Sequence, residues 1–421
     1  MNRLPHRWPL HWQIISALFI GLATGHILGP ENRSIPVFGF AGDLFLRALK
    51  MVIVPLIASS IITGIAGLGS SKSIGRLFTR TFGWYMLTSL LAILLGLLLV
   101  NAFQPGLVDG VPVGEKMGLS ELDPVTSAKI SGKGANDLAN ILMRMIPENP
   151  VGAAAEGKIL PLIVFCLMVG AALNALPEKL SAPQCRFWES LFQVMMKITG
   201  WVIKTAPIGI FGLITMVTAT NGLEALGPLA KYAAIVLAAL LGHVFITLPL
   251  LLWFTSRISA VKHYKAMLPA LVTAFSTRSS SATLPLTINC VEEEVGVSNR
   301  VSSFVLPLGA TINMDGTALY ECIAALFIAQ AYGVVLGPLD QFLVVITALL
   351  ASIGAAGIPA AGLVMIAIIL DTVGLPLEGV GLILAIDPLL DMCRTSVNVL
   401  SDSCGAAVVA VKEGETGLYK N

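Results

Sequence analysis

Six polar residues recur at helical spacing near the end of the chain, and their types suit the binding of a charged small molecule. They are Asp387, Asp391, Arg394, Thr395, Asn398 and Asp402. On a helix through residues 387–402 all six fall within an arc of about 100°, and the opposite face is apolar. One helix would therefore present three carboxylates, a guanidinium and two neutral hydrogen-bonding groups to a single place.

The guanidinium and the nearest carboxylate of this stripe suggest an acidic amino acid as the ligand. Arg394 offers a planar fork that fits a carboxylate. Asp391, about one helical turn away, can accept hydrogen bonds from an ammonium group. The spare carboxylates, joined by Asp315 in the segment 313–317 (NMDGT), suit hard monovalent cations, and Gly316 could let a helix unwind to expose carbonyl groups.

Two other interpretations give the stripe no ligand. It could be the solvated face of a surface helix, although the flanking segments are apolar and each charge within a membrane helix costs at least about 2.5–3.5 kcal/mol. It could also be a buried ion pair of Asp391 with Arg394. That pair would leave Asp387 and Asp402 uncompensated, so we favour a binding site.

The composition places this stripe in a membrane protein. The chain has 421 residues, of which 56% are hydrophobic and 12% charged, whereas soluble domains carry about 25% charged residues. This excludes an ordinary soluble enzyme, a disordered chain and a coiled coil. The net charge of +1 gives no reason to expect nucleic acid as a partner, and the six cysteines lack the spacing of a zinc site or a disulfide framework.

Six apolar stretches reach about the 20 residues that a membrane-spanning helix needs. They are His11–Gly29, Leu44–Leu68, Phe82–Ala102, Leu160–Leu176, Phe192–Thr218 and Leu229–Phe254. The first lacks the cleavage site of a signal peptide. Lys and Arg gather in alternate loops, which predicts a cytoplasmic N-terminus. The short termini and short loops favour a multi-pass protein of a bacterial inner (plasma) membrane with both termini cytoplasmic.

Two later segments, Ala270–Cys290 and Leu343–Leu370, each consist of an apolar arm, a small polar tip and a second apolar arm. Backbone that is not helical survives at membrane depth only where protein or a water-filled cavity satisfies it. Paired interruptions of this kind indicate the binding site of a transporter. The alternative is that Gly and Pro merely kink two ordinary spans.

Four motifs resemble those of the dicarboxylate/amino acid:cation symporter family, which includes the excitatory glutamate transporters and archaeal aspartate transporters. They are, in the family's order, residues 278–285 (RSSSATLP), 313–317 (NMDGT), 351–359 (ASIGAAGIP) and the aspartate–arginine stripe. The resemblance implies an all-α polytopic membrane protein with eight transmembrane helices, two re-entrant helical hairpins and inverted repeats. It also implies a homotrimer in membrane lipid that transports by an elevator mechanism.

The resemblance further implies that residues 1–421 form one integral membrane unit with a static part and a moving part. The scaffold would comprise residues 1–75 and 125–222. The transport domain would comprise residues 76–104, 223–257, 259–292 (hairpin one), 296–333 (helix seven), 338–370 (hairpin two) and 376–412 (helix eight).

Carried over residue by residue, the resemblance assigns ten residues to the substrate. Arg394 would bind its side-chain carboxylate and Asp391 its ammonium group. The set is Arg278, Ser279, Ser280, Thr317, Ile358, Gly362, Asp391, Arg394, Thr395 and Asn398.

The resemblance also implies three sites for co-transported sodium ions, and no organic cofactor. One would use Asp402, one would use backbone carbonyls closed over by hairpin two, and one would use Asp315 with a Tyr-x-x-Thr-Ser motif. The residues are Tyr85, Thr88, Ser89, Gly309, Thr311, Asn313, Met314, Asp315, Ser352, Ile353, Ala355, Asn398 and Asp402. Relatives often have Thr in place of Ala355, but the ligand there is a carbonyl, so the change should be tolerated.

Glu321 is a candidate for coupling transport to protons. Animal glutamate transporters have a glutamate here that resembles a proton carrier, whereas archaeal aspartate transporters do not. Burial favours the neutral form of a carboxylate, so Glu321 could take up a proton near neutral pH. The alternative is a glutamate permanently paired with Arg278 or Arg394.

The sequence therefore predicts a secondary active symporter for L-glutamate, L-aspartate or both, driven by sodium, with coupling to protons left open. The alternatives are a carrier of C4-dicarboxylates or neutral amino acids from the same family, and an anion channel. Asp391 argues against a substrate without an ammonium group. An enzyme is not expected, because Ser279–Ser281 lack a credible histidine partner and His263 is predicted to lie in a cytoplasmic loop.

Overall fold

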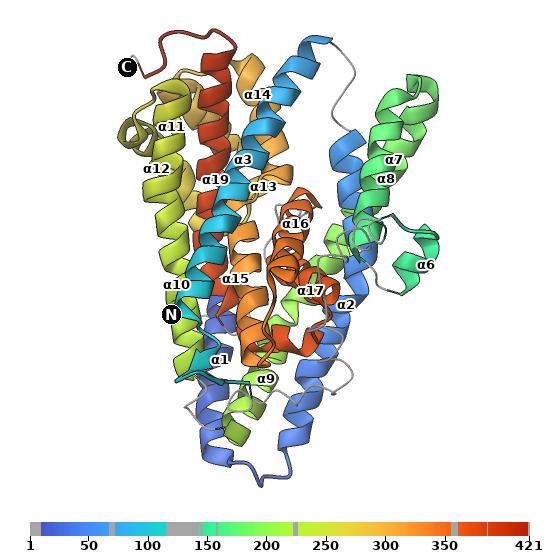
Figure 1. The fold of residues 1–421 in the computed structure, drawn as a ribbon. Helices are drawn as coiled ribbons and strands as arrows, with labels where there is room; N and C mark the ends of the chain where they lie inside the picture. Colours follow the sequence, from blue (N-terminus) through green and yellow to red (C-terminus); the bar gives the residue numbers. More distant parts are fainter. Residues whose placement is uncertain are drawn as a thin grey trace, which may run out of the picture.

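The computed structural model describes residues 10–66, 72–114, 143, 146–156, 159–221, 226–354, 361–384 and 386–419. Most of the elements in these ranges are helices, and they pack in two groups (Figure 1). This agrees with the prediction of a helical membrane protein.

The first group contains helices from the N-terminal half of the chain. Its members are α1 (Leu10–Leu28), α2 (Ile35–Ala66), α6 (Pro150–Ala155), α7 (Ile159–Ala175), α8 (Glu178–Lys204) and α9 (Ala206–Asn221). α1 packs along α9, and α2 contacts α7, α8 and α9. A Cβ on Gly212 would lie 2.4 Å from the carbonyl oxygen of Phe38, so glycine lets α2 and α9 meet at backbone distance.

The second group contains the other helices of the described ranges, with α15 and α19 at its centre. Its members are α3 (Lys72–Phe103), α10 (Leu226–Gly242), η4 (His243–Thr247), α11 (Leu248–Ser256), α12 (Ala260–Thr277), α13 (Ser280–Asn289), η5 (Cys290–Val295), α14 (Asn299–Ile312), α15 (Asp315–Ala331), α16 (Pro338–Gly354), α17 (Ala361–Val373), η6 (Leu377–Gly379), α18 (Val380–Ile383) and α19 (Asp387–Lys412). Most side chains of α15 and α19 are buried. In Figure 1, α3 (light blue) passes in front of both helices and contacts them.

Within the described ranges, three helical segments are long and apolar enough to cross a membrane: Arg76–Phe103, Gly227–Ser256 and Asn299–Ala331. Over the span predicted at residues 192–218, α8 and α9 pass the same test only as a pair, which meets at a bend of 47°. Thr205 separates the two helices, and Pro207 lacks the N–H group that a continuous helix would use. The number of eight crossings stays a prediction.

Both interrupted segments form pairs of helices that contact each other. In the first, Arg278 ends α12 in the left-handed conformation (φ 53°) and the hydroxyl of Ser279 accepts a hydrogen bond of 3.1 Å from the N–H of Ala282. Such an oxygen caps the start of α13. In the second, α16 contacts α17, and the tip between them, with Ala355 and Ile358, lies outside the described residues.

A short β-hairpin departs from the all-α prediction. Strands β1 (Leu107–Val108) and β2 (Val111–Pro112) pair antiparallel after α3. Asp109 and Gly110 between them have φ of 53° and 78°, as a two-residue hairpin turn requires. The Asp-Gly pair flanked by valines was the signal for this turn in the sequence.

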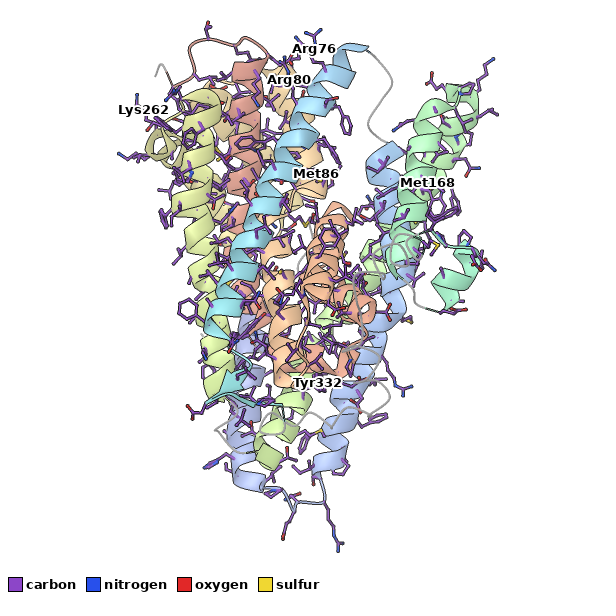
Figure 2. The ribbon with its side chains drawn as sticks, in the orientation of Figure 1. Arg76, Arg80, Met86, Met168, Lys262 and Tyr332 are labelled. Atoms are coloured by element: carbon purple, nitrogen blue, oxygen red, sulfur yellow. The ribbon has the colours of Figure 1, made fainter. Side chains whose placement is uncertain are left out.

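The C-terminal segment, residues 413–419, returns to the end of the second group at which α3 begins (Figure 1). Its Tyr419 Oη lies 2.7 Å from Nδ1 of His263, and Glu413 forms an ion pair of 2.7 Å with Arg80. Figure 2 shows three basic side chains at this same end: Arg76, Arg80 and Lys262.

Candidate functional site

The polar stripe of α19 faces the interior of the protein. Its six members are between 0 and 6% exposed, and they are Asp387, Asp391, Arg394, Thr395, Asn398 and Asp402. A solvated surface helix would leave such groups exposed, so that interpretation of the stripe is wrong. The stripe instead lies against α12, α14 and α15, which contact α19.

Arg394 is fully buried and is shared by two aspartates. Its Nη2 lies 2.9 Å from Oδ1 of Asp387 and 2.9 Å from Oδ1 of Asp391. The guanidinium carbon also lies 3.7 Å from the centre of the Tyr320 ring, on α15, which is a favourable cation–π distance. The expectation that an internal ion pair would leave Asp387 uncompensated is therefore wrong, because Arg394 reaches both carboxylates.

The rest of the guanidinium retains capacity to bind a ligand. Among the described residues, Nε and Nη1 of Arg394 have no hydrogen-bond partner although both are buried. A Cβ on Gly362 would lie 3.1 Å from Nη1, so the backbone of α17 approaches this side of the group. Two unsatisfied donors on a buried cation favour an anionic ligand, since buried polar groups are normally hydrogen-bonded.

The neutral residues assigned to the substrate gather around the same part of α19. Asn398 donates from Nδ2 to Thr317 Oγ1 at 3.1 Å and accepts from the N–H of Gly316 at 2.8 Å. Thr395 donates to the carbonyl oxygen of Asp391 at 2.8 Å. Asn398 thus joins the start of α15 to α19.

Hairpin one contributes three of the assigned residues at its tip. Arg278 and Ser280 are buried, at 6% and 5% exposure. Ser279 caps α13 as described above, and both helices of this hairpin, α12 and α13, contact α19. Of the ten residues assigned to the substrate, Ile358 alone lies outside the described ranges.

A second cluster, made of oxygen atoms, surrounds Asp315 at the start of α15. Ser89 donates to Asp315 Oδ1 at 2.6 Å, and Thr88 donates to the same oxygen at 3.2 Å. Ser401 donates to Oδ2 at 2.5 Å, and Nε2 of His243 lies 3.1 Å from Oδ2. All five side chains are completely buried.

Asp402 extends this cluster toward α14. Asn313 donates from Nδ2 to Asp402 Oδ1 at 2.9 Å, and the hydroxyl of Tyr85 donates to the carbonyl oxygen of Val305 at 2.8 Å. A Cβ on Gly309 would lie 2.5 Å from Asp402 Oδ1 and 2.6 Å from Tyr85 Oη. Carboxylates, hydroxyls and amide oxygens packed this closely are ligands for hard cations, so the residues present fit sodium.

The remaining residues assigned to sodium are less closely joined to this cluster. Thr311 and Ser352 donate to carbonyl oxygens of their own helices, those of Leu308 and Leu349, both at 2.8–2.9 Å. Met314 is buried at the break between α14 and α15. Ile353 lies at the end of α16, and Ala355 follows it outside the described residues.

Glu321 is buried on α15 and takes part in none of the ion pairs among the described residues. Among the described residues, neither of its carboxylate oxygens has a hydrogen-bond partner. Arg394 instead pairs with Asp387 and Asp391. The permanent ion pair with an arginine that was the alternative for Glu321 is therefore not formed within the described part of the chain.

Sequence reasoning missed several residues of these clusters. Tyr320 and Ser401 carry no signal that separates them from packing residues. His243 could have been found, because it is the only histidine in the apolar stretch 229–254 and an ionisable group within a membrane span is a candidate functional residue. The prediction that His263 lies in a loop is wrong: it is buried in α12 between Tyr419 and Ser403.

Comparison with known proteins identifies the family of this chain. Residues 10–412 match the sodium:dicarboxylate symporter family. The chain is 33% identical to the proton/glutamate-aspartate symporter of Escherichia coli (strain K12), over 96% of this chain and 93% of that protein. It is 33% identical to the proton/sodium-glutamate symport protein of Bacillus caldotenax, over 96% and 95% of the two chains, and 37% identical to excitatory amino acid transporter 3 of Mus musculus, over 94% and 85%. The chain therefore belongs to the sodium:dicarboxylate symporter family.

Proposed function

We propose that the protein is a secondary active symporter that takes up L-glutamate, L-aspartate or both, driven by sodium ions. The observation that carries this proposal is Arg394, a buried guanidinium whose Nε and Nη1 donors find no partner among the described residues. Those two donors are the complement of a carboxylate. Relatives whose names refer to glutamate or aspartate symport support the same substrate class.

Asp391 argues for an amino acid over a C4-dicarboxylate. It lies 2.9 Å from Arg394 through Oδ1, so a carboxylate that reaches Arg394 also comes close to Asp391. A substrate with an ammonium group at that distance neutralises the carboxylate, whereas a second anionic group would be repelled. The binding pocket therefore selects against dicarboxylates that lack an amine.

Sodium is proposed as the co-transported ion, with no organic cofactor. The oxygen atoms around Asp315 and Asp402 would hold it, and Asn398 links that cluster to the substrate residues. A cation that orders Asn313 and Asn398 would also order the substrate pocket. Binding of sodium and substrate would then strengthen each other, as linkage requires.

We further propose an elevator mechanism in a homotrimer with eight membrane crossings. The scaffold would be residues 1–75 and 125–222, and the transport domain would be residues 76–104, 223–257, 259–292, 296–333, 338–370 and 376–412. The packing of the helices into two groups supports this division. Hairpin two, α16 and α17, would act as the outer gate because α17 approaches Arg394.

Glu321 is proposed to carry a proton together with sodium. Its isolation from partners among the described residues supports this role, since a carboxylate buried without a partner is stable only in its neutral form. The protein would be a multi-pass protein of a bacterial inner membrane with cytoplasmic termini. Its basic end in Figure 2 would face the cytoplasm.

Uptake by purified protein in lipid vesicles tests the function. Labelled glutamate and aspartate are offered while sodium, pH and potassium gradients are varied one at a time. We expect concentrative uptake that collapses without sodium, and competition by aspartate but not by succinate. Equal competition by succinate would favour a dicarboxylate carrier, and current without accumulation would favour a channel.

A further inference from the structure

His243 is a buried histidine that touches the cation cluster. It begins η4, the π-helical turn between α10 and α11, and its side chain is completely buried. Its Nε2 lies 3.1 Å from Oδ2 of Asp315. The element also packs against α3, which carries Thr88 and Ser89. The residue therefore belongs to the surroundings of Asp315, although its type is unusual among ligands of sodium.

The four donors around Asp315 are divided evenly between its two oxygens. Ser89 and Thr88 donate to Oδ1, while Ser401 donates to Oδ2, the oxygen that His243 also approaches. The donors on Oδ1 come from α3, and those on Oδ2 come from α19 and η4. Donors on both sides fix the plane of the carboxylate and turn Oδ1 toward α3.

The hydrogen bonding determines which nitrogen of the imidazole donates. Oδ2 of the carboxylate is an acceptor, so Nε2 of His243 carries a hydrogen and donates it. Nδ1 has no partner among the described residues, so His243 reaches the cluster through Nε2 alone.

The backbone at His243 is adapted to this role. Residues 243–247 are wound as a π-helix inside an otherwise α-helical span, and single π turns occur frequently at functional sites. The widened turn is supported by Tyr264, whose hydroxyl donates to the carbonyl oxygen of Val244 at 2.5 Å. The turn and its brace together set the direction of the histidine that follows Gly242.

We propose that His243 is a positioning residue for the cation site at Asp315. It holds Oδ2 through its Nε2–H donor, so that Oδ1 stays aimed at Thr88 and Ser89, where the cation is to be bound. This inference rests on the proposed sodium coupling. It assigns His243 no contact with the cation or the substrate.

Two substitutions separate the donor from the bulk of the side chain. His243→Phe removes the donor and keeps a ring, whereas His243→Gln keeps an N–H donor at similar reach. For the purified protein, we measure sodium-dependent thermal stabilisation without substrate, which reports binding directly. We also measure the sodium concentration for half-maximal uptake and the KM for the amino acid at saturating sodium. His263→Gln, in a histidine equally buried but bonded to Tyr419 and Ser403, is the matched control.

We expect His243→Phe to raise the sodium requirement about tenfold in both measurements, equivalent to about 1.4 kcal/mol. The sodium requirement of His243→Gln should stay within about threefold of that of the parent protein, a change smaller than the loss of a typical hydrogen bond would cause. The KM for the amino acid at saturating sodium should stay the same in the His243 variants. The His263→Gln control should keep the sodium dependence of the parent protein. If His243→Phe fails to fold, His243→Met supplies the variant without a donor.

Two results would overturn the inference. A sodium dependence of His243→Phe or His243→Met equal to that of the parent would show that the donor does nothing for the site. An equal shift in His243→Gln would show that the donor is not the cause. If the parent protein itself shows no sodium dependence, the proposed sodium coupling fails, which is a different outcome from either of these.

Discussion

Arg394 and Asp387 lie two helical turns apart on α19, and Nη2 of the arginine is 2.9 Å from Oδ1 of the aspartate. Tyr320 supports the guanidinium from the face of its ring, and Asp391 takes the same Nη2. One nitrogen thus anchors the guanidinium to its own helix, while Nε and Nη1 have no hydrogen-bond partner among the described residues. A side chain held in this way loses little entropy when it binds a carboxylate.

Replacing Arg394 should separate the charge of the guanidinium from its fork. In Arg394→Lys the charge remains but its donors sit on a single nitrogen without the planar fork, so we expect the affinity for glutamate to fall about tenfold or more. In Arg394→Ala the carboxylate loses both donors, and Asp387 and Asp391 lose their cation, so we expect a fall of at least about 100-fold. Uptake of labelled glutamate and of a neutral amino acid is measured side by side. Unchanged glutamate uptake in Arg394→Ala would contradict the assignment of the binding site.

Replacing Glu321 by glutamine tests coupling to protons. Glutamine keeps the size of the side chain but cannot exchange a proton, so uptake should lose its dependence on pH while sodium dependence remains. The rate of uptake is compared across about pH 5.5 to 8, because burial disfavours the charged form of a carboxylate. Asp340→Asn on α16 is the control, because Asp340 is also buried but lies outside both clusters. A glutamine variant that keeps the pH profile of the parent would exclude Glu321 as the proton carrier.

Gly309 makes a steric test of the cation cluster possible. In Gly309→Ala the new methyl group would lie 2.5 Å from Asp402 Oδ1 and 2.6 Å from Tyr85 Oη, so one of the two must move. Overpacking of this kind costs about 1–3 kcal/mol, and we expect the sodium concentration for half-maximal uptake to rise about tenfold. Gly83→Ala is the control on α3, because a Cβ there meets no atom within 4 Å. Equal sodium dependence in the two variants would show that sodium does not bind beside Asp402.

The C-terminal segment should stabilise the end of the second helical group. The hydroxyl of Ser403 donates to the carbonyl oxygen of Leu400 at 2.7 Å, so it accepts from Nε2 of His263, 2.9 Å away, and Nδ1 accepts from Tyr419 at 2.7 Å. Tyr419→Phe and Ser403→Ala should each lower the free energy of unfolding by about 1 kcal/mol. Because both bonds share one imidazole, the double variant should lose less than the sum of the two. Thermal unfolding of the four proteins in detergent gives the comparison, and strict additivity would mean that the chain of bonds is not cooperative.

The motifs predicted more of the site than of the surrounding helices. The stripe 387–402 has a period that only a helix satisfies, and its burial follows from the cost of charge in a membrane, so residues such as Arg394 and Asp402 could be assigned from the sequence. The bend at Thr205 was missed because an apolar run hides a break in the helix. The strands within residues 107–112 were missed because strands of two residues are too short to show an alternating pattern. Asp387 was judged to lack a partner because the prediction gave Arg394 a single carboxylate.

The sequence by itself determined which residues are too costly to bury without a function, since apolar length and the spacing of charges are local properties of the chain. It determined the membrane class, the family resemblance and most of the residues around Arg394 and Asp315. Only the tertiary structure decided which residues pair: that Asp387 shares Arg394, that Glu321 has no hydrogen-bond partner among the described residues, and that His243 reaches Asp315 across 72 residues. Hydrogen bonds of this kind depend on distances of a few tenths of an ångström between separate helices, and spacing along one helix carries no information about them.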